Sequence, residues 1–349
     1  MRHIVATIFN YADMKSITLV ILISLFPCVS FSQEGVKKNY TSIEKISEIK
    51  LDYDLISDVI EFEILGDKIL VLDKPQAKIF VFDRNGNLIN SIGNKGRGPG
   101  EFVYPSAFAV DDNNDIYVFD RQLIRVSIFE ESGNLIETFN TNGINAADIE
   151  VFDGKLYLYT PFTIDKIAHV IDIKTQELIK SFGEASTFQK RARVLSNSTT
   201  VMGLGRIKDK IYVLSHIYEQ NISVFNLEGE AISSFHPQSR EFKDHTIPES
   251  FDLHQILDDV AGGLKKYLSH ATLTFNAFED KIYMVISDLD QEKYYLEVFD
   301  QQGNILNTQE IELEKGKDEL KVFKDGIFYS MNLYDESNNL YKIVTYKLN

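Results

Sequence analysis

Tryptophan is absent from the 349 residues, and cysteine occurs once, at Cys28. A single cysteine cannot form a disulfide within its own chain. If residues 1–32 are removed after export, the remaining chain has no thiol chemistry. The lack of tryptophan also removes the residue on which glycan enzymes commonly stack a sugar, although tyrosine and phenylalanine can substitute.

Basic residues are also scarce, because 36 lysines and arginines stand against 52 aspartates and glutamates, a formal net charge of -16. Non-specific nucleic-acid binding needs a basic surface, so we expect no nucleic-acid partner. The acidic balance favours solubility and does not specify a ligand.

The long apolar run ITLVILISLFPCV (17–29) follows Met14-Lys15 and precedes the small residues of Ser30-Phe31-Ser32. A positive start, a short apolar core and small residues at the cleavage site predict a signal peptide over 1–32, with Met14 as an alternative translation start. The run is shorter than the roughly 20 residues of a membrane span. We therefore expect an exported protein, periplasmic or extracellular, with no transmembrane span in the mature chain.

Cys28 leaves a second interpretation open, in which the chain is a lipoprotein at the cell surface that serves nutrient uptake. Lipidation would need small residues before the cysteine, but Phe26 and Pro27 precede it. The sequence therefore favours cleavage after Ser32. The polar residues 33–40 are predicted to form a disordered linker.

One stretch defines the fold. ILVLD (69–73) and KIFVFD (78–83) have strand composition, Asn85-Gly86-Asn87 is a tight turn, and LINSIG (88–93) and EFEIL (61–65) add two more strands. Four antiparallel strands in about 40 residues are typical of a propeller blade.

This unit recurs along the chain. Its further copies begin at DDNNDIYVFD (111–120), FDGKLYLYT (152–160), KDKIYVLS (208–215), EDKIYMVI (279–286) and KDGIFYSMN (324–332). The sixth copy lacks its fourth strand, which SIEKISEIKL (42–51) can supply from the other end of the chain. We therefore predict an all-β, six-bladed β-propeller over 41–349, with an N-terminal strand closing the last blade.

The largest departure from the repeat is the segment 237–270, between blades 4 and 5. Within SFDLHQILDDVAGGLKKYL (250–268), apolar residues recur at helical spacing after Ser250, a plausible helix cap. We expect a short helical insertion packed on one face of the disc.

The motif GNKGRGPGEFVYP (93–105), which follows DRNGNLINSI, resembles the six-bladed β-propeller proteins secreted by Bacteroidota, which are similar to NHL-repeat propellers. The resemblance implies the fold and an exported location. It implies no activity, because that family has no common chemistry.

No catalytic residue is predicted. GNKGRGPGEF lacks the lysine and serine or threonine that begin the helix of a phosphate loop, so a glycine-rich joint between blades is favoured. The Asp- and Asn-rich turns fit hairpin chemistry better than any calcium loop. The resemblance to NHL-like lyases implies zinc-binding histidines in the channel, where only His169 and His216 are candidates, too few for a three-ligand site.

Position predicts a binding face. The loops between blades and the turns between the middle strands of each blade share one face of a propeller, and here they carry basic residues: Lys95, Arg97, Arg121, Arg125, Lys190, Arg191 and Arg193. Tyr104, Tyr218 and Tyr334 are placed on the same face. This basic arc suits an anionic group. The alternative is that the arginines pair with Glu101, Asp120 and Glu184.

The sequence thus favours an exported, non-catalytic binding or scaffold propeller, a monomer that recognises a protein, a peptide or an anionic glycan at one face, without a cofactor. The alternative is a metal-dependent lyase or hydrolase with calcium or zinc in the central channel.

Overall fold

The computed structural model describes residues 43–51, 56–161, 163, 165–185, 203–244, 268–311, 319–324, 327–335 and 340–348. Contacts divide the chain into residues 1–38 and residues 39–349, and every described residue belongs to the second unit. The expected signal peptide, the linker and residues 250–267 of the expected helix lie outside the described ranges.

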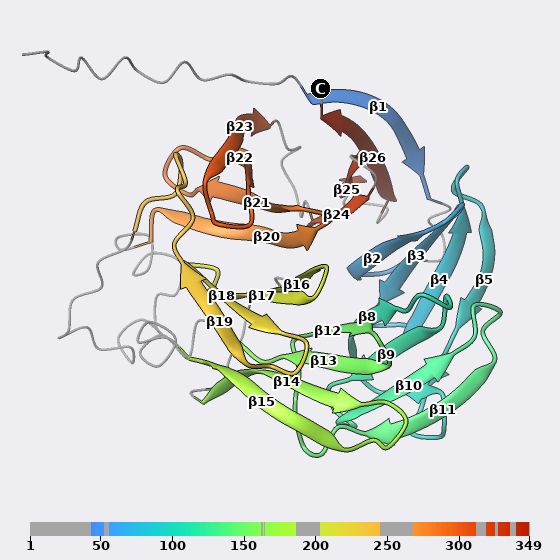
Figure 1. The fold of residues 1–349 in the computed structure, drawn as a ribbon. Helices are drawn as coiled ribbons and strands as arrows, with labels where there is room; N and C mark the ends of the chain where they lie inside the picture. The colour runs from blue at the N-terminus through green and yellow to red at the C-terminus, as the bar shows by residue number, and fades with distance from the viewer. Residues whose placement is uncertain are drawn as a thin grey trace, which may run out of the picture. The chain divides into compact units, whose positions relative to one another are not determined.

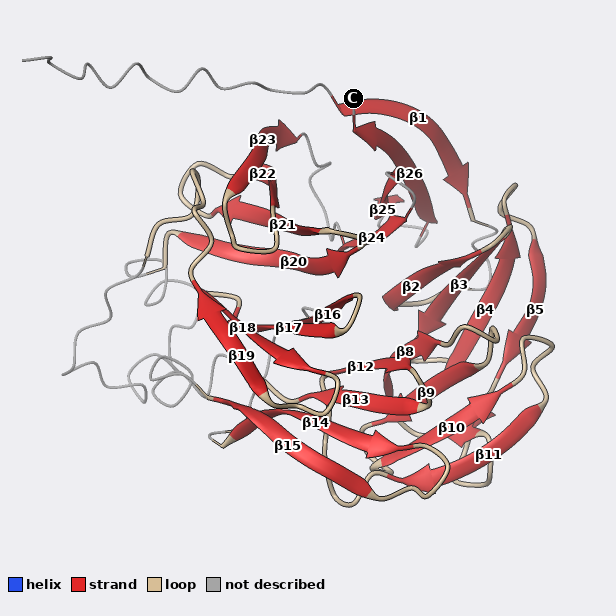
Figure 2. Cartoon of the chain, viewed as in Figure 1, coloured by secondary structure: helices blue, strands red, loops and turns tan. Residues whose placement is uncertain are grey.

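The described part of the chain contains six four-stranded antiparallel sheets arranged around an axis (Figure 1). In five sheets the strands follow one another in sequence order, and in the sixth β1 lies beside β26 as the fourth strand. Every regular secondary-structure element in the described residues is a β-strand (Figure 2). The predicted all-β, six-bladed propeller is therefore confirmed. In the described residues, no helix is long and apolar enough to span a membrane.

The strand bounds follow the predicted sequence copies. Blade 1 comprises β2 (Val59–Leu65), β3 (Lys68–Asp73), β4 (Lys78–Asp83) and β5 (Leu88–Ile92). Blade 2 comprises β8 (Pro105–Val110), β9 (Ile116–Asp120), β10 (Arg125–Phe129) and β11 (Leu135–Asn140). Blade 3 comprises β12 (Asp148–Phe152), β13 (Lys155–Tyr159), β14 (Lys166–Asp172) and β15 (Leu178–Glu184).

The second half repeats this pattern. Blade 4 comprises β16 (Leu204–Ile207), β17 (Lys210–His216), β18 (Glu219–Asn226) and β19 (Ala231–Phe235). Blade 5 comprises β20 (His270–Phe278), β21 (Lys281–Asp288), β22 (Lys293–Phe299) and β23 (Ile305–Ile311). Blade 6 comprises β24 (Glu319–Lys324), β25 (Ile327–Asp335), β26 (Leu340–Leu348) and β1 (Ile43–Lys50).

The strand expected over 42–51 corresponds to β1, which pairs antiparallel with β26 at the outer edge of blade 6. The pairing sets Ile49 opposite Ile343, and the Leu51 N–H donates to the Tyr341 carbonyl over 3.1 Å. One apolar core joins Leu51 and Ile343 to Phe80 and Phe82 of blade 1. The inner strands β2 and β24 also touch, so the ring of blades is closed.

The third and fourth strands of blades 1 to 5 share one irregularity. In each pair the register shifts at the same place, as between Val81 and Phe82 or between Val298 and Phe299. Because the shift falls at the same place in each blade, it identifies equivalent positions in different blades. The cross-strand pairs at one such position, two residues before the residue that follows the shift, are Phe80–Ser91, Ser127–Thr138, His169–Ser181, Ser223–Ser234 and Glu297–Thr308.

The turns between the third and fourth strands use the predicted chemistry. Oδ1 of Asp83 accepts hydrogen bonds from the backbone N–H groups of Asn85 (2.8 Å) and Asn87 (2.9 Å). Gly86 has a φ of +86°, and a Cβ there would lie 1.9 Å from the Lys50 carbonyl oxygen of β1. Glycine is required at this turn both for its backbone angle and because the preceding blade approaches so closely.

Candidate functional site

One face of the ring carries the blade-to-blade joints and the turns between second and third strands; we name it the joint face. Buried aspartates at the ends of second strands organise it. Oδ2 of Asp120 accepts the Val103 (2.6 Å) and Tyr104 (3.1 Å) N–H groups of the joint, and Oδ1 accepts those of Gln122 and Leu123, both at 2.9 Å. The carboxylate therefore fixes the joint to the turn.

Asp73 does the same in blade 1. Its Oδ2 accepts the Ser57 N–H at 2.5 Å, and its Oδ1 accepts the Gln76 N–H at 3.0 Å. In the sequence, Asp73 and Asp120 end the strand stretches ILVLD and IYVFD. Strand composition alone does not indicate that these aspartates hold the loops. The aspartates make the loops of blades 1 and 2 rigid supports for the side chains on them.

Lys95 and Arg97 are exposed on the joint between blades 1 and 2, which contains the short parallel strands β6 (Asn94–Lys95) and β7 (Glu101–Phe102). The Arg125 guanidinium lies beneath this joint. Its Nη1 donates to the Arg97 carbonyl (3.1 Å), and its Nη2 donates to the carbonyls of Gly98 and Glu101, both at 2.6 Å. Arg125 therefore clamps the loop that presents Lys95 and Arg97.

Tyr104 lies beside a lysine that the sequence analysis missed. The Lys74 ammonium is 4.1 Å from the centre of the Tyr104 ring, a cation–π contact. The Arg121 N–H donates to the Tyr104 carbonyl over 2.9 Å, so Arg121 is close by. We name Lys74, Lys95, Arg97, Tyr104 and Arg121 the basic cluster; all five lie on the joint face of blades 1 and 2.

The carboxylates that could have neutralised the arginines have other partners. Oε2 of Glu101 accepts the Gly98 N–H at 2.7 Å, and Glu184 forms an ion pair with Lys166. Asp120 holds the backbone groups described above. Lys95 and Arg97 are exposed on a loop that is fixed from below, and the Glu101 carboxylate lies against the same loop at Gly96 and Gly98.

The other predicted residues are not brought into this cluster. Lys190, Arg191 and Arg193 lie outside the described residues. Tyr218 belongs to blade 4, where its ring centre is 5.6 Å from that of His216. Burial raises the pKa of Tyr218 and lowers the pKa of His216 to about 4. Tyr334 lies in β25, the second strand of blade 6, and no contact with the basic cluster is described for it.

The central channel is acidic between blades 1, 2 and 3. A cavity of about 390 Å³ there is lined by Glu61 and Glu63 of β2, Asp111, and Glu150 of β12. Burial, and then the charges of Asp148, Glu63 and Glu61, raise the pKa of Glu150 well above its ordinary value. The sequence analysis missed these residues, because only the blade register shows that they point to the axis.

The two histidines proposed for the channel lie elsewhere. His169 is on β14, the third strand of blade 3, where Nε2 is 3.0 Å from Thr160 Oγ1 and Nδ1 is 2.8 Å from Ser181 Oγ. His216 ends β17, the second strand of blade 4. Within the described ranges, no three His, Cys, Asp or Glu side chains are grouped to hold a metal ion.

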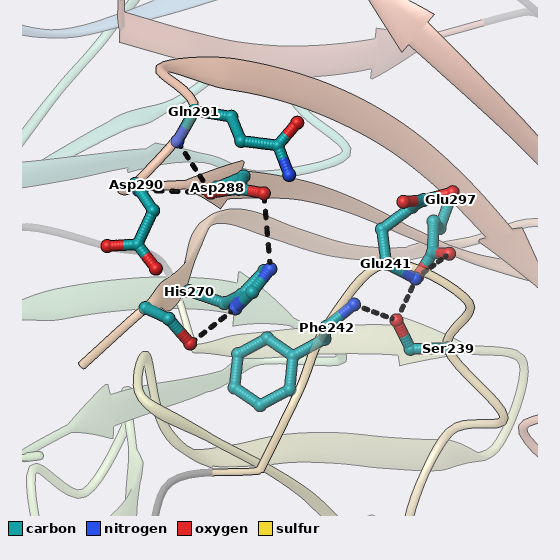
Figure 3. A network of polar contacts seen from close by, with 9 residues as sticks. Ser239, Glu241, Phe242, His270, Asp288, Asp290, Gln291 and Glu297 are labelled. Atoms are coloured by element: carbon teal, nitrogen blue, oxygen red, sulfur yellow. Dashed lines mark hydrogen bonds and ion pairs between the residues drawn. The ribbon is translucent and has the colours of Figure 1, made fainter. Parts of the chain in front are cut away.

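At blade 5 a serine, a histidine and an aspartate that no sequence motif indicated lie together, and Figure 3 shows His270 beside Asp288. Ser269 Oγ is 2.8 Å from His270 Nδ1, and His270 Nε2 is 3.6 Å from Asp288 Oδ2. Asp288 also accepts the Asp290 and Gln291 N–H groups, at 3.0 and 2.9 Å. Asp288 thus holds a turn as Asp73 and Asp120 do, and the three residues form a structural link between β20 and β21.

Comparison with known proteins supports the fold. Residues 43–207 match a family described as a domain of unknown function, DUF4934. Among curated proteins, none matches the sequence.

Several solved structures are similar. A Bacteroides fragilis protein described as exported has 17% identity and a TM-score of 0.57, over 87% of this chain and 94% of that one. A DUF4221 family member from Bacteroides vulgatus has 12% identity and a TM-score of 0.60, over 89% and 99%. An inactive virginiamycin B lyase variant from Staphylococcus aureus, with quinupristin, has 12% identity and a TM-score of 0.50, over 83% and 80%. These likenesses confirm the resemblance to propellers of Bacteroidota at the level of fold.

Proposed function

We propose that this protein is an exported propeller that binds a carboxylate-bearing partner at the basic cluster. The observation that carries the proposal is the pair of exposed cations, Lys95 and Arg97, on a loop that Arg125 clamps through three carbonyl hydrogen bonds. A clamped loop loses little conformational entropy on binding, which favours affinity.

Charge supports this location. The chain carries a net charge of -16, so most of its surface repels an anion. A local group of cations is felt within the roughly 8 Å over which physiological salt screens charge. Carboxylates can approach Arg97 in bidentate fashion and Lys95 as a point charge.

Export rests on two supports. The first is the apolar run 17–29 between Met14-Lys15 and Ser30-Phe31-Ser32. The second is the structural likeness to the Bacteroides fragilis protein that is described as exported. Cell fractionation followed by mass spectrometry tests export. We expect the protein to be recovered outside the cytoplasm, with a mass that corresponds to a chain beginning at Gln33.

Titration with two anionic polymers, polyglutamate and polygalacturonate, tests the binding site. We expect the double variant Lys95→Ser/Arg97→Ser to bind about tenfold more weakly, because two exposed charge pairs contribute about 1 kcal/mol or more together. Added salt should weaken binding further.

The matched control is Lys174→Ser/Lys347→Ser, which removes the same charge at two exposed positions outside the basic cluster. Equal losses in both double variants would show that the polymers sense only net charge. Absence of binding to either polymer would refute the proposed ligand class.

A second candidate is an enzyme with its site in the acidic channel that Glu61, Glu63 and Glu150 line. These three carboxylates are not grouped to hold a metal ion by themselves, so any ion there would need further ligands. The fold of virginiamycin B lyase, which this chain resembles, shows that a propeller of this kind can support catalysis. Metal content of the purified protein, with thermal melts before and after a chelator, separates the two. A stoichiometric ion whose removal lowers the melting temperature would favour the enzyme.

A further inference from the structure

Neighbouring blades are separated by slots, and one of these slots has the features of a second binding site. Each slot lies between the fourth strand of one blade and the third strand of the next. In two of the described slots, the chain itself passes through. The joint 93–102 fills the slot between blades 1 and 2, where Phe102 packs on Phe129 with ring centres 5.8 Å apart.

The slot between blades 4 and 5 holds the segment 237–242 (Figure 3). The Gln238 N–H donates to the Gly303 carbonyl over 2.7 Å. Oε1 of Glu297, on the third strand of blade 5, accepts the Arg240 N–H at 2.8 Å and the Glu241 N–H at 3.2 Å. Phe242 packs on the core shared by the two blades. The segment shows how this type of slot holds a stretch of chain through its backbone N–H groups, here with a bend at residues 240 and 241.

Among the residues that the structure describes, which omit 186–202, the slot between blades 3 and 4 is a groove of about 910 Å³ between β15 and the strands β18 and β19. By register, Ser223 occupies the position of Glu297, and Ser234 the position of Thr308. The small serine side chains leave space that Phe80, His169 and Glu297 occupy in blades 1, 3 and 5, while blade 2 also has a serine there. The floor is the apolar interface of Phe182 with Phe225, whose ring centres are 4.7 Å apart.

We propose that this groove binds an extended peptide segment of a partner protein, added as a strand along β15. β15 is the outermost strand of its sheet, and its consecutive residues 180–184 line the groove. Strand addition at such an edge is a common mode of peptide recognition. The site is separate from the basic cluster and does not depend on it.

The groove also specifies the chemistry of the peptide. Ser223 and Ser234 leave room for side chains on the inward face of the added strand, and their hydroxyl groups suit polar ones. Lys166 on the β15 side is ion-paired with Glu184, while the neighbouring Lys180 is exposed at the groove. Lys180 complements an acidic side chain on the partner, so we commit to an extended peptide that carries one.

The test begins with hexapeptides selected from a displayed random library on the full protein. Ser223→Phe should weaken the selected peptides at least tenfold, because phenylalanine would fill the groove as Phe80 does at the same position of blade 1. Thr175→Phe, at an exposed turn, is the matched control and should bind unchanged.

Lys180→Glu offers a variant that keeps the fold, because the side chain is exposed. It should weaken peptides that carry an acid, and peptide binding should slow hydrogen exchange in 178–184. Lys95→Ser/Arg97→Ser should leave peptide binding intact, which separates this site from the basic cluster. Failure to select any peptide, equal binding to Ser223→Phe, or a crystal structure in which another part of this chain fills the groove would each overturn the proposal.

Discussion

Carboxylates buried in this propeller differ in what surrounds them, and that difference sets their roles. Asp120 is fully buried yet accepts four backbone N–H groups, so its charge is well solvated by the protein. For Glu297, burial raises the pKa, although hydrogen bonds from Ser239, Arg240 and Glu241 oppose the rise. Glu150 is half-buried and faces other carboxylates, a setting that is unfavourable for a charge.

Glu150→Gln should stabilise the protein at neutral pH. A carboxyl group whose pKa is raised in the folded state stabilises the fold fully below its ordinary pKa of 4.5, and this contribution is lost as pH rises through the folded value. Glutamine mimics the protonated form at every pH. We expect a melting temperature roughly 2 °C higher at pH 7, with no gain near pH 4.

The exposed Glu177→Gln serves as the control for this experiment and should not change the pH dependence of melting. Thermal melts between pH 4 and pH 8 provide the comparison. A neutral-pH melting temperature that falls in Glu150→Gln would contradict the unfavourable setting assigned to this carboxylate.

Asp120→Asn should destabilise the protein by about 2–3 kcal/mol, because an amide turns N–H groups toward buried backbone donors and leaves some unsatisfied. Urea unfolding measures the loss, and exposed Asp67→Asn is the matched control. The variant should also weaken anion binding, because Asp120 holds the Tyr104 joint. Unchanged stability would show that the joint does not depend on this anchor.

Two turns that contain a glycine, at Gly86 and Gly154, differ in how closely another strand approaches them. Gly86 and Gly154 both have positive φ, +86° and +68°. A Cβ at Gly154 would meet nothing within 4 Å, whereas one at Gly86 would lie 1.9 Å from the Lys50 carbonyl oxygen. The two positions therefore separate the conformational requirement from the packing requirement.

Gly154→Ala should lose about 1 kcal/mol through its backbone angle alone. Gly86→Ala should lose at least about 1 kcal/mol more, because the turn must move away from β1. Chemical denaturation of the two variants measures the difference. Equal losses would mean that the contact between the blade 1 turn and β1 adds nothing to stability.

The whole ring depends on a contact between segments far apart in the sequence. β1 covers the edge of β26, and Ile49 packs on the core that links blades 6 and 1. An uncovered β26 would expose backbone groups that pair with other chains.

Two truncated chains test this dependence, one beginning at residue 43 and one at residue 51. The first keeps β1 and should melt cooperatively. The second should melt at a clearly lower temperature and self-associate in sedimentation, because the β26 edge is open. A shorter chain that remains monomeric and equally stable would show that closure by β1 is dispensable.

The blades were predictable because their signals are local. Alternating β-branched and aromatic residues, and turns such as Asn85-Gly86-Asn87, depend on short stretches that repeat six times. Loop order alone also predicts that the cations Lys95, Arg97 and Arg121 share one face, and their part in binding stays a prediction. Arg125 differs, because its guanidinium turns to the carbonyls of the joint, which no spacing rule reveals.

The sequence by itself determined the six repeated sheets and the positions of their loops, because strand and turn preferences act over a few residues. Only the tertiary structure decided which side chains of those loops and strands come together in one site. It grouped Lys74 with Tyr104, set Glu61 and Glu150 around one cavity, and formed a groove beside Ser223 among the described residues. These features depend on the register and the packing of blades whose residues are far apart in the chain, so local preferences do not encode them.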